Sequence, residues 1–250
     1  MTNNFSNCRL FVILVGLGVG VSGCGGLKEN ASPLGPPGQH IPFRPENEIL
    51  AEDLSFDLAA GEIHYNLPEP ALVRLRIGRA AGGALLRTMI DWERREKGPH
   101  VEVWDKKDAS GKVDFSGIND VAAVLACRPV DGRGAPIALR GLGKSPDFEI
   151  IFVTAQERDE TGTVIVSGKT PVRIVVADRD IAWLREGGYE IVLYVDQVFL
   201  IEGEKGISPF NYLLNVEGFN EGYHYLIVNV ASFSGEVGTK TAKFYVKKGG

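Results

Sequence analysis

Residues 62–77 read Glu-Ile-His-Tyr-Asn-Leu-Pro-Glu-Pro-Ala-Leu-Val-Arg-Leu-Arg-Ile, and the fold class can be inferred outward from them. Apolar side chains occupy alternate positions on both sides of the two prolines. These positions are Ile63, Tyr65, Leu67, Val73, Leu75 and Ile77. Because successive side chains of a strand point to opposite faces, this period of two predicts strands with one covered face. The stretch therefore predicts two β-strands separated by a turn at Pro68 and Pro70.

Short apolar runs of this kind recur along the chain. Before residue 155 we expect further strands at Leu85–Met89, Val101–Trp104, Val121–Cys127 and Phe148–Thr154. Beyond the polar residues 156–162 we expect strands at Val164–Val166, Val172–Ala177, Tyr189–Val195, Val198–Ile201, Phe210–Val216, Tyr223–Ala231 and Thr241–Val246. A short helical turn is expected over residues 178–187. The pattern predicts an all-β fold of two tandem antiparallel β-sandwiches, over residues 49–155 and 163–250.

The first 23 residues have the parts of a bacterial export signal. Arg9 ends a short polar stretch, and Leu10–Val21 is an apolar run of about a dozen residues, whereas a membrane-spanning helix needs about 20. Val21-Ser22-Gly23-Cys24 follows and resembles the lipobox of bacterial lipoproteins. The resemblance implies that residues 1–23 are a signal peptide and that Cys24 carries a lipid thioether. A plain signal peptide, or an uncleaved anchor, is the alternative.

Residues 24–48 are expected to form a flexible tether between the lipid and the folded part. Glycine and proline recur there, at Gly25, Gly26, Pro33, Gly35, Pro36, Pro37, Gly38, Pro42 and Pro45. This composition leaves little chance of a helix or a central strand. Several acyl chains would hold the protein firmly, since one chain alone gives marginal anchoring. We therefore expect a membrane-anchored envelope protein, and Gly25 resembles the residue that favours outer-membrane sorting.

Charge and cysteine usage exclude several classes of function. The formal net charge of −5 offers no basic field for nucleic acid. Besides Cys8 and Cys24 the chain has only Cys127, so the mature part cannot form an intramolecular disulfide. The sequence has no Cys-x-x-Cys motif and no Cys/His cluster, which leaves haem, iron–sulfur and structural zinc sites without ligands. We expect no cofactor and no small-molecule substrate.

Residues 62–112 resemble a known family. They contain Leu67-Pro68-Glu69-Pro70, then Leu85-Leu86-Arg87-Thr88, then Trp104-Asp105-Lys106-Lys107-Asp108-Ala109-Ser110-Gly111. This order resembles the Ig-like domain shared by the flagellar hook-capping protein family and many secreted bacterial proteins. Lys106 stands where that family usually has glycine, and the Gly-x-Tyr that often follows the turn is not found at this point of the sequence. The resemblance implies an Ig-like sandwich and does not imply flagella.

Residues 164–250 resemble, more loosely, the Ig-like repeats of bacterial surface proteins. The features concerned are Pro209-Phe210 before a strand, Gly222-Tyr223-His224 at the start of the next, and a last strand that ends at Val246. This resemblance implies a second Ig-like domain, in which His224 is a structural corner residue.

Each candidate chemical group has a structural alternative. Glu102, Asp105 and Asp108 offer oxygen ligands for calcium, but their spacing is not that of an EF-hand loop, and Asp-x-x-Gly is typical of a turn. Trp104 is expected to pack over the sandwich edge, with a sugar-stacking platform as the alternative, and Cys127 is expected to be a buried, inert thiol. The histidines lie apart, at positions 40, 64, 100 and 224, and no serine lies in a Gly-x-Ser-x-Gly elbow. We therefore expect no catalytic residue and no metal ligand.

The segment Tyr189–Ile201 is apolar on both faces, whereas a strand with one solvated face should alternate. One interpretation is a central strand pair joined by a tight turn at Asp196-Gln197, and the other is an apolar face presented to a partner. Val192 and Tyr194 are in phase with acidic residues, which directs them away from the core of their own sandwich. We predict that Val192, Tyr194 and Phe199 form an exposed patch for a protein partner.

These observations favour a non-enzymatic, lipid-anchored envelope protein that acts as a scaffold or accessory binding subunit of an envelope or surface-appendage assembly. Its folded part would lie in the periplasm or at the cell surface, with other envelope proteins as partners. The second hypothesis is a carbohydrate- or peptidoglycan-binding lipoprotein. It requires exposed aromatic side chains gathered on one face, drawn from Trp92, Trp104, Trp183 and the tyrosines. An enzyme with an unrecognised site is the third hypothesis.

Overall fold

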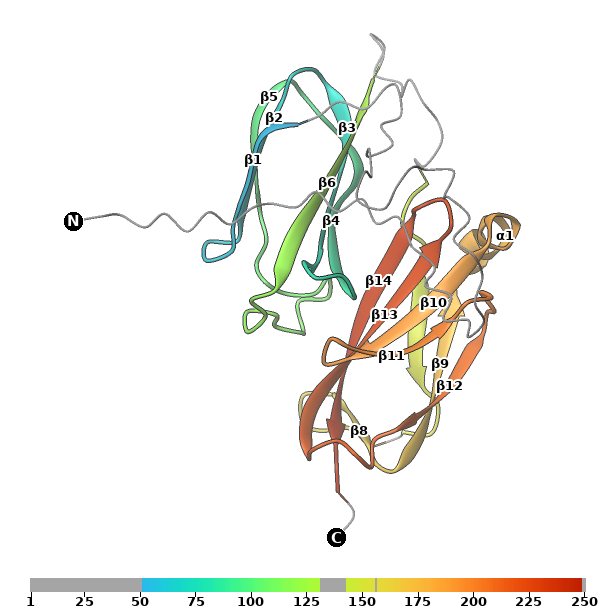
Figure 1. Cartoon of the computed structure of the whole chain (residues 1–250). Coiled ribbons are helices and arrows are strands. Elements are labelled where there is room, and N and C mark those ends of the chain that lie inside the picture. The colour runs from blue at the N-terminus through green and yellow to red at the C-terminus, as the bar shows by residue number, and fades with distance from the viewer. Residues whose placement is uncertain (1–50, 131–142, 156, 249–250) are drawn as a thin grey trace, which may run out of the picture.

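The computed structural model describes residues 51–130, 143–155 and 157–248. Within these ranges the chain forms fourteen strands and one helix, arranged as two β-sandwiches (Figure 1). The helix α1 spans Asp178–Gly187, which are the bounds expected from the sequence. Each strand expected from the sequence is also present, with ends that differ by a few residues. The all-β fold class is confirmed.

The first sandwich contains the strands of the N-terminal half. One sheet has the order β1-β2-β5, with the bounds Glu52–Asp57, Glu62–Leu67 and Gly98–Val103. The other has the order β4-β3-β6, with the bounds Leu85–Arg95, Ala71–Arg79 and Val121–Pro129. All of these pairs are antiparallel. The alternating apolar positions of β2 and β3 fill one common core, as their period of two predicts.

The second sandwich has a larger and a smaller sheet. The larger has the order β11-β10-β13-β14-β8, with the bounds Val198–Gly203, Tyr189–Val195, Gly222–Ser232, Val237–Val246 and Val164–Val166. The smaller has the order β12-β9-β7, with the bounds Phe210–Asn215, Lys169–Val176 and Phe148–Phe152. Only the short β8 pairs in parallel, with β14, among the described strands. The facing sheets bury residues such as Ile174, Leu193 and Val228.

The boundary between the sandwiches differs from the prediction. Strand β7 pairs with β9 and therefore belongs to the second sandwich, so the predicted ranges 49–155 and 163–250 divide the chain in the wrong place. The last strand of the first sandwich is β6. Residues 157–162, near the predicted boundary, instead lie inside the second sandwich, where the Asp159 carboxylate accepts the N–H groups of Thr161 and Thr163 in a turn. Turns within a domain and linkers between domains are both polar in composition. The sequence therefore did not distinguish them, and the predicted domain boundary was wrong.

Strand β1 was not expected from the sequence. Its residues, Glu-Asp-Leu-Ser-Phe-Asp, have mostly weak β-propensity. Asp53 has a φ of 51°, at the point where the pairing with β2 changes register. Leu54 and Phe56 nevertheless pack against the first core, and this packing accounts for the strand.

Candidate functional site between the two sandwiches

The outward face of the larger sheet is covered by the first sandwich. Alternate side chains of β10 fill the core of the second sandwich. Val192 and Tyr194 point the other way and join the core cluster of the first sandwich, together with Ile227 of β13. Strands β4 and β14 lie side by side where the two halves meet (Figure 1). We call this region the interdomain contact.

The predicted exposed patch is wrong at Val192 and Tyr194, which are 8% and 9% exposed. The hydrophobic period correctly directed both residues away from their own core. The error was to treat the outward face as open to solvent, whereas a neighbouring domain of the same chain covers it. Phe199 is 57% exposed, as predicted, and its ring meets that of Tyr194 edge-on with 6.0 Å between the centroids. Phe199 therefore lies at the rim of the interdomain contact.

Asn229 joins the two sandwiches through the backbone of Leu85. Its Oδ1 accepts the Leu85 N–H at 2.9 Å, and its Nδ2 donates to the Leu85 carbonyl at 3.0 Å. The Thr239 hydroxyl donates to the same carbonyl at 2.7 Å. Buried backbone groups at the start of β4 are thus satisfied by side chains of the other sandwich, which makes the relative position of the two domains specific.

A buried ion pair lies beside this apolar region. Arg74 is 5% exposed and donates from Nε to Oδ1 of Asp91 at 3.0 Å. The same guanidinium donates to the carbonyl oxygens of Gly143 and Gly235. Oδ2 of Asp91 accepts the N–H of Ser145 at 2.7 Å. One charged pair of the first sandwich therefore holds both the segment leading into the second sandwich and the β13–β14 turn.

Arg76 lies two positions further along β3 and also donates to the Gly235 carbonyl, at 3.2 Å. Burial, and then the neighbouring charge of Arg74, lower the pKa of Arg76 to about 10. In the sequence both arginines alternate with the apolar residues of the strand, and arginine is a residue type that is mostly exposed. The acidic residue Asp91 on the next strand was the available signal for a buried pair.

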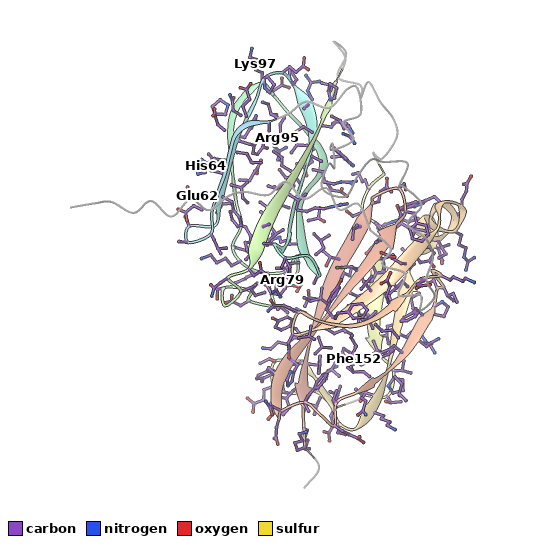
Figure 2. The ribbon with its side chains drawn as sticks, in the orientation of Figure 1. Glu62, His64, Arg79, Arg95, Lys97 and Phe152 are labelled. Carbon is purple, nitrogen blue, oxygen red and sulfur yellow. The ribbon has the colours of Figure 1, made fainter. Side chains whose placement is uncertain are left out.

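A second polar contact lies at Arg79, where the two sandwiches meet (Figure 2). Arg79 donates from Nη2 to Asp120 at 2.9 Å and from Nη1 to Oε1 of Gln197 at 2.7 Å. Gln197 donates in turn to the Tyr225 hydroxyl at 2.6 Å. Asp196 and Gln197 form the turn between β10 and β11, with φ values of 47° and 71°. The tight turn between two paired strands is confirmed, but only β10 is central, since β11 forms the edge of the sheet. The turn contributes to the interdomain contact.

Other groups singled out from the sequence hold local structure. Asp108 is buried, and its Oδ1 accepts the N–H groups of Lys112 and Val113, both at 2.9 Å. Nδ1 of His224 lies 2.5 Å from a carboxylate oxygen of Asp196, in keeping with the structural role expected of this histidine. In the described part of the chain, no group of three His, Cys, Asp or Glu side chains could hold a metal ion. These carboxylates and this imidazole stabilise turns.

Trp104 and the pair of Tyr223 and Tyr245 do not form a flat platform for a sugar ring. Trp104 is 1% exposed, and its Nε1 donates to a backbone carbonyl at 3.0 Å. The expected packing of Trp104 is confirmed, with the ring inside the core of the first sandwich. Tyr223 is exposed and pairs with Tyr245, but their rings stand at 78° to each other. Both hydroxyls already donate to acidic side chains. Cys127 is buried, as expected for an inert thiol.

The predicted lipidation site, Cys24, and the tether lie outside the described residues. Among the residues that are described, no helix is both long and apolar enough to span a membrane.

Glu190 continues the outward row of β10 and is 6% exposed. Burial, and then the nearby carboxylates of Glu202 and Glu204, raise the pKa of Glu190 from 4.5 to about 7. A carboxyl whose pKa is higher in the folded state binds more protons when folded. Its contribution to the free energy of unfolding therefore falls as the pH rises from about 4.5 to 7.

Replacing Glu190 with glutamine should consequently raise the free energy of unfolding at pH 8 by about 1–3 kcal/mol and have little effect at pH 4.5. Urea unfolding of both proteins across this pH range measures the difference. Glu69→Gln removes an exposed carboxyl and serves as the control, which should unfold like the parent at every pH. A Glu190→Gln protein with an unchanged pH dependence would contradict the assignment.

No protein-family model and no curated protein matches the chain. Among solved structures, the fibronectin(III)-like modules of CbhA from Clostridium thermocellum align with 80% of this chain and 94% of theirs, at 12% identity and a TM-score of 0.30. A β-glucuronidase from Ruminococcus gnavus aligns with 82% of this chain and 40% of its own, at 10% identity and a TM-score of 0.23. Similarity at this level carries no argument about function. The sandwich architecture rests on the chain's own strands, and the resemblance to the hook-capping family stays a prediction.

Proposed function

We propose that this chain is a non-enzymatic, lipid-anchored scaffold or accessory binding subunit of a bacterial envelope or surface-appendage assembly. Cys24 carries the lipid, residues 25–48 form the tether, and the two sandwiches act as one rigid body. Other envelope proteins bind to that body and are held at a fixed place relative to the membrane.

The observation that carries the proposal is the interdomain contact. A scaffold must keep its binding surfaces in a constant orientation. Val192 and Tyr194 supply an apolar centre, Arg74 and Asp91 supply a buried ion pair, and Asn229 supplies directional hydrogen bonds. Interfaces between domains of one chain are often polar and permit movement. The combination found here instead favours a single arrangement.

The chemistry of the described residues supports a non-enzymatic role. The acids and histidine considered for catalysis or metal binding, including Asp108 and His224, make hydrogen bonds that hold turns. The carbohydrate-binding alternative gains no support from Trp104, which lies in the core, or from the perpendicular pair of Tyr223 and Tyr245.

Lipid attachment is tested at Cys24. Mass spectrometry of the protein from native membranes should find an acylated Cys24 at the N-terminus and no peptide from residues 1–23. Cys24→Ala should abolish acylation and move the folded part out of the membrane fraction. If the Cys24→Ala protein is still processed and membrane-bound, the lipid assignment is wrong.

The scaffold role is tested by capture of the native protein from detergent-solubilised membranes. Envelope proteins should co-purify in constant proportion with the parent chain. Binding to purified peptidoglycan, with no protein co-purified, would contradict the proposal and support the alternative.

A further inference from the structure

Strand β5 forms one edge of the first sandwich. It pairs with β2 without any change of register, and no other described strand lies on its far side. The N–H of Trp104 bonds the carbonyl of Gly61 on the β2 side. Because backbone groups of successive residues point to opposite edges, the N–H and C=O groups of Val101 and Val103 point to the open edge. Pro99 fits this assignment, since its missing N–H is tolerated there.

The outer face of β5 is apolar and open to solvent. Val101 is 53% exposed and Val103 is 62% exposed. They lie beside His64 and Glu62 of β2, whose side chains project from the outer surface of the first sandwich (Figure 2). An edge strand with unpaired backbone groups and exposed valines is a template for pairing with another strand.

The sequence of β5 is complementary to itself. If two copies pair antiparallel with Val101 opposite Val101, then Val103 lies opposite Pro99 of the second copy. The backbone then makes two hydrogen bonds between the Val101 residues and two from Val103 N–H groups to Pro99 carbonyls. On the other face, His100 lies opposite Glu102 of the second copy, which places an imidazole beside a carboxylate on both sides of the axis.

His100 and Glu102 each keep one group available for this pairing. Nε2 of His100 lies 2.7 Å from the Glu96 carbonyl, and Oε1 of Glu102 accepts bonds from Tyr65 and Arg95. Within the described residues, Nδ1 of His100 and Oε2 of Glu102 make no hydrogen bond. Both ring and carboxylate are thus held in position by their own chain. Because Nε2 donates to the Glu96 carbonyl, Nδ1 can donate to the carboxylate of the second copy only when the ring carries two N–H groups.

We propose that the open edge of β5 pairs with β5 of a second copy of this chain, about a two-fold axis at Val101. The three-stranded sheets of two first sandwiches then form one continuous sheet. Pairing does not require the lipid, but two copies tethered to one membrane meet at a raised effective concentration.

Cysteine cross-linking of the full-length protein in its native membrane tests this register. Residues paired across an antiparallel ladder have Cα atoms about 5.5 Å apart, within the roughly 4.4–6.8 Å range that a disulfide spans. Val101→Cys should therefore form a disulfide-linked dimer under a mild added oxidant. Two Val103→Cys residues would be offset by four positions, or about 13 Å, along the strands, and should yield at least tenfold less dimer.

Val103→Cys is the matched control, because Val103 lies on the same strand and is more exposed than Val101, at 62% against 53%. Equal cross-linking at both positions, more at position 103, or none at position 101 would overturn the proposal.

A second variant, Val101→Lys, places like charges on the axis. In detergent it should sediment as a monomer with an unchanged melting temperature while the parent sediments as a dimer. A parent chain that is monomeric in this measurement also overturns the proposal. The Cys24→Ala chain should dimerise like the parent in concentrated solution, so a failure of the dimer proposal can be distinguished from a failure of the lipid assignment.

Discussion

Replacing both Val192 and Tyr194 with glutamate should lower the free energy of unfolding by roughly 4 kcal/mol or more. Both side chains lie in the core cluster of the first sandwich, although they belong to a strand of the second. The substitution would place two charges among the apolar side chains of this cluster, and burying unpaired charge is among the costliest changes in a protein. Urea unfolding followed by circular dichroism measures the effect.

The control lies on the same hairpin. Val198 is 70% exposed, so Val198→Glu and Val198→Lys should each change stability by only about 0.5 kcal/mol. If the Val192→Glu/Tyr194→Glu protein is as stable as these variants, the outward row of β10 is not part of an interdomain core.

Replacing Asp91 with alanine should be nearly as damaging, at about 3–5 kcal/mol. The change leaves the guanidinium of Arg74 buried without its carboxylate and removes the acceptor of the Ser145 N–H. Replacing both partners, as Arg74→Met with Asp91→Leu, should recover most of this loss, because breaking a buried pair costs more than replacing it with apolar groups.

Arg94 and Glu96 form the matched control, since they are 2.9 Å apart but solvent-exposed. Removing either charge should cost only about 0–1 kcal/mol, as is usual for surface pairs. An Asp91→Ala protein that loses no more than Glu96→Ala would show that the Arg74–Asp91 pair contributes little to the interdomain contact.

Much of the fold could be predicted because its strands are strongly periodic. The alternation around Ile63 and Val73, the apolar β10 and the helix at Asp178–Gly187 all follow from local sequence. Strand β1 did not, because its charged residues have weak β-propensity and its pairing is irregular at Asp53.

The interdomain contact could be predicted only in part. The alternation of side chains along β10 predicts that Val192 and Tyr194 point outward. It does not distinguish a face that is open to solvent from one that is covered by another domain. Arg74 is of a residue type that usually lies at the surface. Its burial depends on Asp91 and on the carbonyl groups of Gly143 and Gly235, which are distant in sequence. Tertiary context therefore decided both outcomes.

The central claim, that the two sandwiches form one rigid body, is tested most directly by a distance between them. Spin labels at Ser55→Cys on β1 and Leu213→Cys on β12 would sit on exposed positions of opposite sandwiches, in a chain with Cys8, Cys24 and Cys127 replaced by alanine. The distance between the two labels is measured by pulsed electron–electron double resonance on labelled protein diluted with unlabelled protein. It should show one narrow distribution, which broadens when Val192 and Tyr194 are replaced with glutamate. A broad distribution in the parent protein, unchanged by those substitutions, would contradict the account.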